Sequence, residues 1–208
     1  GIFPNSKFTR NSLALSTSYD ITDNLTFDVN LNVVADNSKG RVSFGYSPTF
    51  GNPVQSFNQW FQRQLTMKEL EEYKTSTGVN RTWNIESPLS PTPLYWDSPY
   101  FTVFENAPTD SRNRYFGNVG MTYKLTDNLS IRAAMHRDTY ANRIEERIGS
   151  GGLELDYYRE LVVTGTEDNY EVVGSYDREF GGVKLDPHVG GNLRQNRYRA
   201  NNGATAGG

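Results

Sequence analysis

The chain has 208 residues, a formal net charge of -3 and no cysteine; 36% of its residues are hydrophobic and 13% are aromatic. No run approaches the roughly 18 to 20 apolar residues of a membrane-spanning helix, which excludes a helical membrane protein. The basic residues are dispersed along the sequence and form no cluster of the kind that binds nucleic acid. The lack of cysteine excludes disulfides and cysteine-based zinc sites. A modest apolar content with many aromatic residues is typical of outer-membrane barrels, in which about every second strand residue is apolar.

The first predicted element is a β-hairpin over about residues 8–34. Apolar side chains occupy alternate positions across 13–21 and again across 25–33, with mostly small polar and acidic residues between them. Residues 22–24, Thr-Asp-Asn, form the expected turn. A period of two indicates strands with one apolar and one polar face.

A long connection follows over about residues 35–113. It allows a short alternating piece at 42–46, and helical spacing then begins at residue 54 and extends to about residue 73. Thr66 with Glu69 predicts a capping box for a second short helix in this stretch. Prolines then interleave with tryptophans and tyrosines, so the backbone is expected to be extended or turning and to stay out of a central sheet.

Two further hairpins are predicted, at about 115–138 and 169–194. The turn of the first of these, at 126–128, repeats the earlier Thr-Asp-Asn, and both copies lie within the motif Tyr-x-(Ile/Leu)-Thr-Asp-Asn-Leu. The last hairpin turns at a Gly-Gly pair, 181–182. A second long connection, at about 139–168, joins these two hairpins.

The connections differ between the two ends of the hairpins. The turns at one end have two or three residues, whereas the connections at the other end are the two long segments. Outer-membrane barrels combine short periplasmic turns with long extracellular loops. The predicted fold is therefore all-β: an antiparallel transmembrane β-barrel segment of about six strands with long extracellular loops that contain a short helical stretch. Residues 1–208 are expected to form part of one such barrel domain.

The hairpins and the long connection together resemble the SusC/RagA family of TonB-dependent outer-membrane transporters of Bacteroidetes. The resemblance rests on short motifs in the family's order, at residues 19–25, 52–53, 59–64, 67–73, 111–118, 123–129 and 132–140. It implies a larger barrel of about 22 strands around a plug. The chain lacks a plug domain, a TonB box and a C-terminal strand ending in an aromatic residue, and we interpret it as an internal piece of a longer polypeptide.

The resemblance implies energy-coupled import of a nutrient such as a glycan or a peptide across the bacterial outer membrane. The implied partners are outer-membrane lipid, a SusD-like surface lipoprotein that serves as a lid, and TonB, acting through the missing N-terminal part. We expect no nucleic-acid partner, no cofactor, no metal and no enzymatic activity, because no nucleophile or phosphate-binding loop is recognisable. Two alternatives remain: a passive porin-type barrel, and a secreted β-rich module that binds carbohydrate.

Three groups of candidate site residues follow. Tyr19 and Tyr123 precede short turns, where an aromatic girdle at the membrane interface is expected; in a soluble sheet they would pack in a core. Three residues share the polar parity of the second hairpin and would face the lumen: Arg132, His136 and Asp138. Four aromatic residues of the long connection are candidates for contact with the solute or the lid, the alternative being that they pack the loop onto itself: Trp83, Tyr95, Trp96 and Tyr100.

Overall fold

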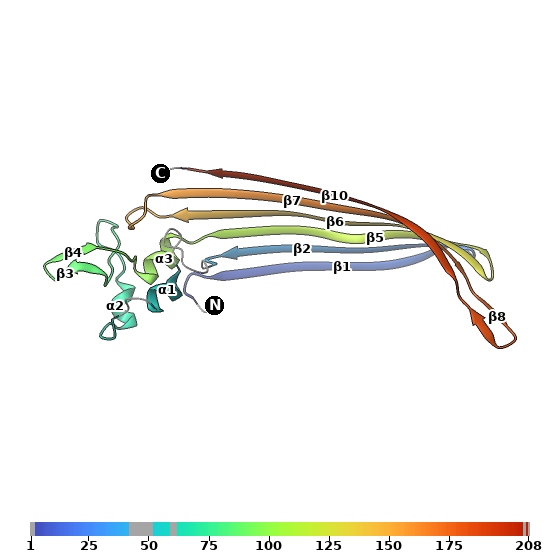
Figure 1. Ribbon diagram of the computed structural model, residues 1–208, viewed down its shortest axis with the longest axis horizontal. Helices are drawn as coiled ribbons and strands as arrows, with labels where there is room; N and C mark the ends of the chain where they lie inside the picture. The colour runs from blue at the N-terminus through green and yellow to red at the C-terminus, as the bar shows by residue number, and fades with distance from the viewer. Residues whose placement is uncertain (1–2, 42–51, 59–61, 206, 208) are drawn as a thin grey trace.

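The computed structural model describes residues 3–41, 52–58, 62–205 and 207 and consists mostly of antiparallel β-structure. Six long strands form one sheet in the order β1-β2-β5-β6-β7-β10, with every neighbouring pair antiparallel (Figure 1). Their bounds are β1 Lys7–Thr22, β2 Leu25–Lys39, β5 Thr109–Thr126, β6 Leu129–Ile148, β7 Tyr157–Tyr176 and β10 His188–Ala204. Among the described residues the sheet is open, because β1 and β10 each pair on one side only.

The two Thr-Asp-Asn turns are tighter than the sequence predicts. Only Asp23-Asn24 and Asp127-Asn128 lie between the strands, since the threonine of each motif belongs to the preceding strand. The Thr126 hydroxyl accepts hydrogen bonds from the backbone N–H groups of Asn128 and Leu129, at 3.3 and 3.1 Å. Threonine hydroxyls bond to nearby backbone in this way at turns, which explains why the residue can close the strand and shape the turn together.

The third hairpin is longer than its predicted bounds and is interrupted. Strands β7 and β10 pair along their length, and the small hairpin of β8 (Arg178–Phe180) and β9 (Val183–Leu185) extends from them at the end opposite the helices (Figure 1). Gly181 and Gly182 have φ angles of +54° and +83°. Two consecutive positive φ values are what a type I′ hairpin turn requires, and glycine adopts them without steric cost.

The long connection between β2 and β5 folds at the other end of the sheet. It contains α1 (Pro53–Asn58), α2 (Met67–Glu71), β3 (Ile85–Ser87), β4 (Ser90–Pro93) and α3 (Pro99–Glu105). The predicted capping box is present: the Thr66 hydroxyl accepts from the Glu69 N–H, and the Glu69 carboxylate accepts from the Thr66 N–H at 2.8 Å. The short strand predicted at 42–46 lies outside the described residues, as do residues 59–61 of the predicted helical stretch.

Helix α3 corrects the expectation that the proline-rich stretch is only extended or turning. Pro99 occupies the start of the helix, where its missing N–H costs nothing and its fixed φ favours helical geometry. The helix directs Phe101 and Val103 inward, and Phe101 is fully buried. The described residues 52–58 and 62–108, here called the loop module, thus have a packed interior.

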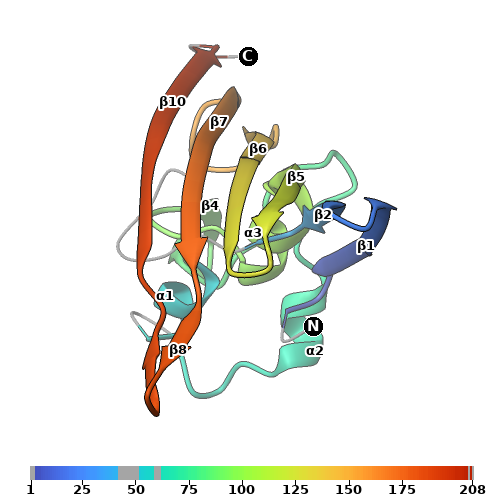
Figure 2. The same ribbon diagram turned by 90° about the vertical axis from the view of Figure 1, so that its right-hand side faces the viewer.

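The six-stranded sheet has no such interior. Figure 2 shows the long strands as a single curved layer, and in Figure 1 the helices and short strands of the loop module lie at one end of the sheet. Most buried hydrophobic side chains of the described residues belong to the loop module: Leu70, Trp83, Trp96, Phe101, Val103 and Ala107. Only Ala134 and Ile148 on the long strands join them.

Candidate functional site: the two faces of the sheet

One face of the sheet is apolar across all six strands. The strand register aligns Tyr19, Phe27, Met121, Ala133 and Val172 side by side, and each neighbouring ladder on this parity is similar. The large side chains on this face that are at least 39% exposed include Leu13, Leu15, Tyr19, Leu31, Tyr115, Val119, Met121, Tyr123, Ile131, Tyr170, Val172, Val189 and Leu193. A continuous exposed apolar surface of this extent marks an interaction with a membrane or another protein.

The apolar surface forms a band that runs obliquely to the strands. The ladder that contains Leu13 is apolar on β1, β2 and β5 but continues as Thr139, Thr166 and Arg197 on β6, β7 and β10. On β10 the last apolar residue of this face is Leu193, four positions nearer the short-turn end. Barrel strands are tilted by about 35–45° to the membrane normal, so a horizontal apolar layer crosses them obliquely.

An ion pair marks the border of the band on β6 and β7. Arg137 is the next residue of this face after Met135, and its Nε lies 2.6 Å from Oδ1 of Asp168. The side chain of Asp168 is only 3% exposed. The Arg137 side chain is 52% exposed, so it neutralises the buried carboxylate with a bidentate contact while keeping contact with the surroundings.

The opposite face is polar and internally hydrogen-bonded. The Ser16 hydroxyl donates to Asn30 Oδ1 at 2.6 Å, and the Asn30 amide donates to Asn118 Oδ1 at 3.2 Å. The Asn118 amide donates in turn to Asp28 Oδ2 at 3.2 Å, and Arg132 bonds both oxygens of Asp28 at 2.5 and 2.8 Å. The network crosses β1, β2, β5 and β6 and satisfies polar groups within the sheet rather than through a second layer.

Gly120 makes the Asp28–Arg132 pair possible. The two residues belong to β2 and β6, which are not neighbours, and the pair passes over β5 at Gly120. A Cβ atom at this position would lie 2.4 Å from an Arg132 guanidinium nitrogen and 2.8 Å from Asp28 Oδ1. The glycine therefore leaves the space in which the two charged side chains meet.

All three predicted lumen-facing residues lie on this polar face. Arg132 bonds Asp28, and Asp138 forms a bidentate ion pair with Arg114. His136 lies between them on β6 and lines a hollow of about 310 Å³ around Phe116, together with Asn32, Asn118, Asp138, Glu167 and Asn169. On the polar face, amide, carboxylate and imidazole groups thus surround the Phe116 ring.

The predicted girdle tyrosines and loop aromatics have different surroundings. Tyr19 and Tyr123 lie on the apolar face near the short turns, 69% and 47% exposed. Trp83 and Trp96 pack with Leu70 in the loop module, and Tyr100 packs against this cluster. Of the four aromatic residues predicted to contact the solute or lid, only Tyr95 is largely exposed, at 72%.

The predicted connection at about 139–168 is wrong in length: β6 and β7 extend through most of it, and only residues 149–156 connect them. A half-buried carboxylate, Asp97, which sequence analysis did not single out, joins this short connection to the loop module. Asp97 Oδ1 accepts hydrogen bonds from the Asn80 amide at 2.8 Å and from the backbone N–H of Leu153 at 3.0 Å. The backbone N–H of Asn80 also donates to the Gly151 carbonyl at 2.7 Å. Burial, with a smaller contribution from the charge of Glu154, raises the pKa of Asp97 above its ordinary value.

Within the described residues, no helix is long and apolar enough to cross a membrane. No group of three or more histidine, cysteine, aspartate or glutamate residues there could hold a metal ion. No protein-family model matches the chain, and no curated protein matches it.

Proposed function

We propose that the chain is part of an outer-membrane β-barrel that imports a nutrient, such as a glycan or a peptide, by a TonB-dependent, energy-coupled mechanism. The observation that carries the proposal is the oblique apolar band on one face, backed by the hydrogen-bonded polar face on the other. Lipid solvates the band, and the polar face lines the lumen through which the solute passes.

The exposed side chains and the sheet edges both support this assignment. A soluble sandwich buries the apolar face of each sheet against a second layer about 10 Å away, and the described residues contain no such layer. Unpaired strand edges cannot lie in lipid, since each free N–H or C=O costs several kcal/mol there. Further strands of the same barrel therefore pair with β1 and β10.

The loop module lies at the end of the sheet assigned to the cell exterior. Its packed core fixes its shape, while Tyr95 and Leu89 project from it, 72% and 98% exposed. These two side chains are its contacts for a solute or for a SusD-like surface lipoprotein acting as a lid. Energy coupling enters through TonB, which acts on a part of the protein outside this chain.

Uptake in cells tests the energy-coupled mechanism against a passive pore. Bacteria that produce the protein are given a labelled nutrient, first with TonB present and then with TonB deleted. Energy-coupled import predicts that uptake falls to the level of cells lacking the protein. Continued uptake without TonB would favour the passive porin-type barrel. A protein recovered in the secreted, lipid-free fraction would instead favour a carbohydrate-binding module.

A further inference from the structure

Two lysines stand side by side at the end of the sheet nearest the loop module. Lys7 on β1 is in register with Lys39 on β2. Directly opposite residues have Cβ atoms about 4.5–5.5 Å apart, and like charges at this distance are destabilising. Both side chains are exposed, and neither has a carboxylate partner among the described residues. The two positive charges are therefore available to an anion.

Three arginines at this end of the sheet form ion pairs. Arg10 bonds Asp36 at 2.7 Å, Arg41 bonds Asp110 at 2.9 Å, and Arg143 bonds Glu160 at 2.5 Å. Among the described residues, Lys7 and Lys39 form no such pair.

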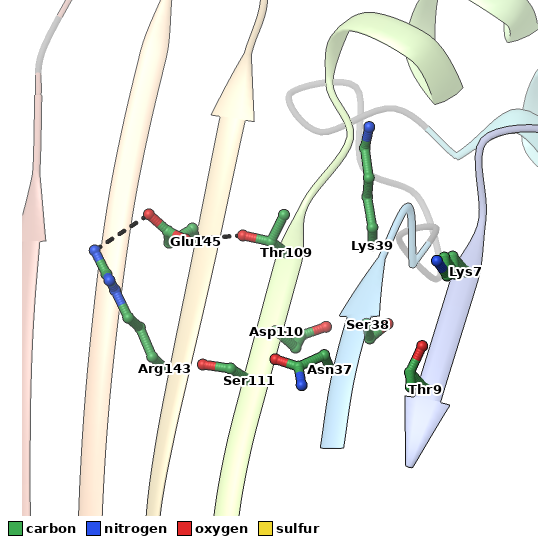
Figure 3. A pocket seen from close by; sticks show the side chains of 10 residues that line it. All are labelled: Lys7, Thr9, Asn37, Ser38, Lys39, Thr109, Asp110, Ser111, Arg143 and Glu145. Carbon is green, nitrogen blue, oxygen red and sulfur yellow. Dashed lines mark hydrogen bonds and ion pairs between the residues drawn. The ribbon is translucent and has the colours of Figure 1, made fainter. Parts of the chain in front are cut away.

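A hollow of about 380 Å³ opens beside the pair. Figure 3 shows Lys39 extending past the end of β2 and Lys7 at the neighbouring end of β1, with side chains of both strands and of β5 arranged along the hollow. Its lining includes the hydroxyl groups of Thr9 and Ser111, the amide of Asn37 and the carboxylates of Asp110 and Glu145. Ammonium, hydroxyl and amide donors of this kind bind phosphate oxygens.

Both carboxylates that line the hollow already have partners. Asp110 bonds Arg41 at 2.9 Å. Glu145 accepts from the Thr109 hydroxyl at 2.9 Å and from the Tyr158 hydroxyl at 2.6 Å, and Arg143 lies 3.3 Å from it. Within the described residues, neither carboxylate pairs with Lys7 or Lys39.

The lysines lie on the apolar face, beyond the border of the band. On β1 this parity runs from Leu13 through Asn11 and Thr9 to Lys7, and on β2 it runs from Val33 to Lys39. Six residues span about 20 Å of strand, or about 15 Å along the membrane normal at a tilt near 40°. A lysine side chain can bend its ammonium back toward the membrane along its four-carbon stem. The ammonium groups thus reach headgroups and not acyl chains.

We propose that Lys7 and Lys39 bind a phosphate group of an anionic lipid headgroup in the leaflet on the loop-module side. This inference rests on the proposed membrane location, because only there does the hollow face headgroups. The phosphate attracts both ammonium groups, and it fixes a lipid against the loop-module end of β1 and β2.

The test uses the intact protein that contains this chain, reconstituted in nanodiscs of phosphatidylcholine with a minor share of phosphatidic acid. Native mass spectrometry measures how strongly the phosphatidic acid is retained. The variant K7Q/K39Q is compared with K68Q/K124Q, which removes the same charge from α2 and from the short-turn end of β5. Two lysines near a membrane surface predict retention about thirtyfold weaker for K7Q/K39Q and unchanged for the control.

Equal retention by both variants would overturn the lysine site while leaving the proposed function intact. Inorganic phosphate is the second arm: displacement of the lipid by dilute free phosphate would show an anion site without a lipid, which also overturns the proposal. If the wild-type protein does not enter the nanodisc, the membrane location itself fails, and the lipid site fails with it.

Discussion

Phe101 in the loop module is fully buried, whereas Leu13 and Tyr19 on the sheet are 66% and 69% exposed. The loop module gathers its tryptophans and Phe101 into a small core, as a protein in water does. The sheet arranges its apolar side chains in a band that contacts nothing in the described chain. The same polypeptide thus contains one part with a packed interior and one part whose apolar face is exposed.

The largest effect is expected in the loop-module core. Phe101→Ala removes a fully buried ring and should lower the free energy of unfolding of the module by about 3–5 kcal/mol. Unfolding is followed by tryptophan fluorescence, because Trp83 and Trp96 lie in the module. Leu89→Ala, at a position 98% exposed, is the matched control and should change stability by less than about 0.5 kcal/mol. Equal losses for the two variants would show that the module has no independent core.

The next effect is on the apolar band. Val119→Arg places a charge in the middle of the band and should cost about 2–4 kcal/mol for folding into lipid vesicles. Ser18→Arg, on the polar face of β1, is the control and should cost little, because the arginine remains solvated. The measurement is a denaturant titration of the vesicle-bound protein. A control as damaging as Val119→Arg would contradict the assignment of the two faces.

Asp97 tests how the loop module is held to the connection between β6 and β7. Asp97→Ala leaves the Asn80 amide and the Leu153 N–H without their acceptor and should destabilise the module by about 1–3 kcal/mol. Asp97→Asn keeps an oxygen acceptor and removes the buried charge, so it should match or exceed the wild type at neutral pH.

The pH dependence has a defined sign. Because the pKa of Asp97 is raised in the folded state, its contribution to stability is present below the ordinary value of 3.8 and is lost as the pH rises through the raised pKa. Unfolding of the module at acidic and neutral pH should show this loss in the wild type and a smaller one in Asp97→Asn. An identical pH dependence in both would assign the effect to another group.

The smallest effect concerns the polar face. A double-mutant cycle with Asp28→Asn and Arg132→Gln should give a coupling energy of about 0.2–1 kcal/mol, since the Arg132 side chain is 36% exposed. The coupling should decrease in a Gly120→Val background, whose side chain occupies the space between the two charges. Gly191→Val, at a position with open space around it, should leave the coupling unchanged.

The strands could be predicted from the sequence because their signal is local. Alternation from Leu13 to Ile21 requires no knowledge of the partner strand, and Thr66 with Glu69 is a capping signature three residues apart. The same alternation predicts that Arg132, His136 and Asp138 share one face of their strand, without knowledge of the neighbouring strands.

The rest depends on contacts between distant residues. The Asp28–Arg132 pair joins positions 104 residues apart and needs a glycine on the strand between them. The sequence around Asp97 carries no signal for its role, because its partners Asn80 and Leu153 are distant in the chain. Exposed tryptophans are common in binding loops, so the sequence around Trp83 and Trp96 suggests ligand contact. Their packing against Leu70 and against helix α3 is visible only in the structure. The oblique border of the band appears only once the register of all six strands is known.

The most direct test of the membrane assignment is an accessibility scan along β5. The chain has no cysteine, so single cysteines can be placed at positions 118, 119, 121, 122 and 123 and spin-labelled in the intact, vesicle-inserted protein. Position 120 stays glycine, because a side chain there would enter the space of the Asp28–Arg132 pair. Lipid-soluble oxygen and a water-soluble nickel complex are used as relaxing agents. We expect alternation with a period of two: oxygen reaches 119, 121 and 123, and nickel reaches 118 and 122. Nickel access at all five positions, or no alternation, would contradict a lipid-facing band.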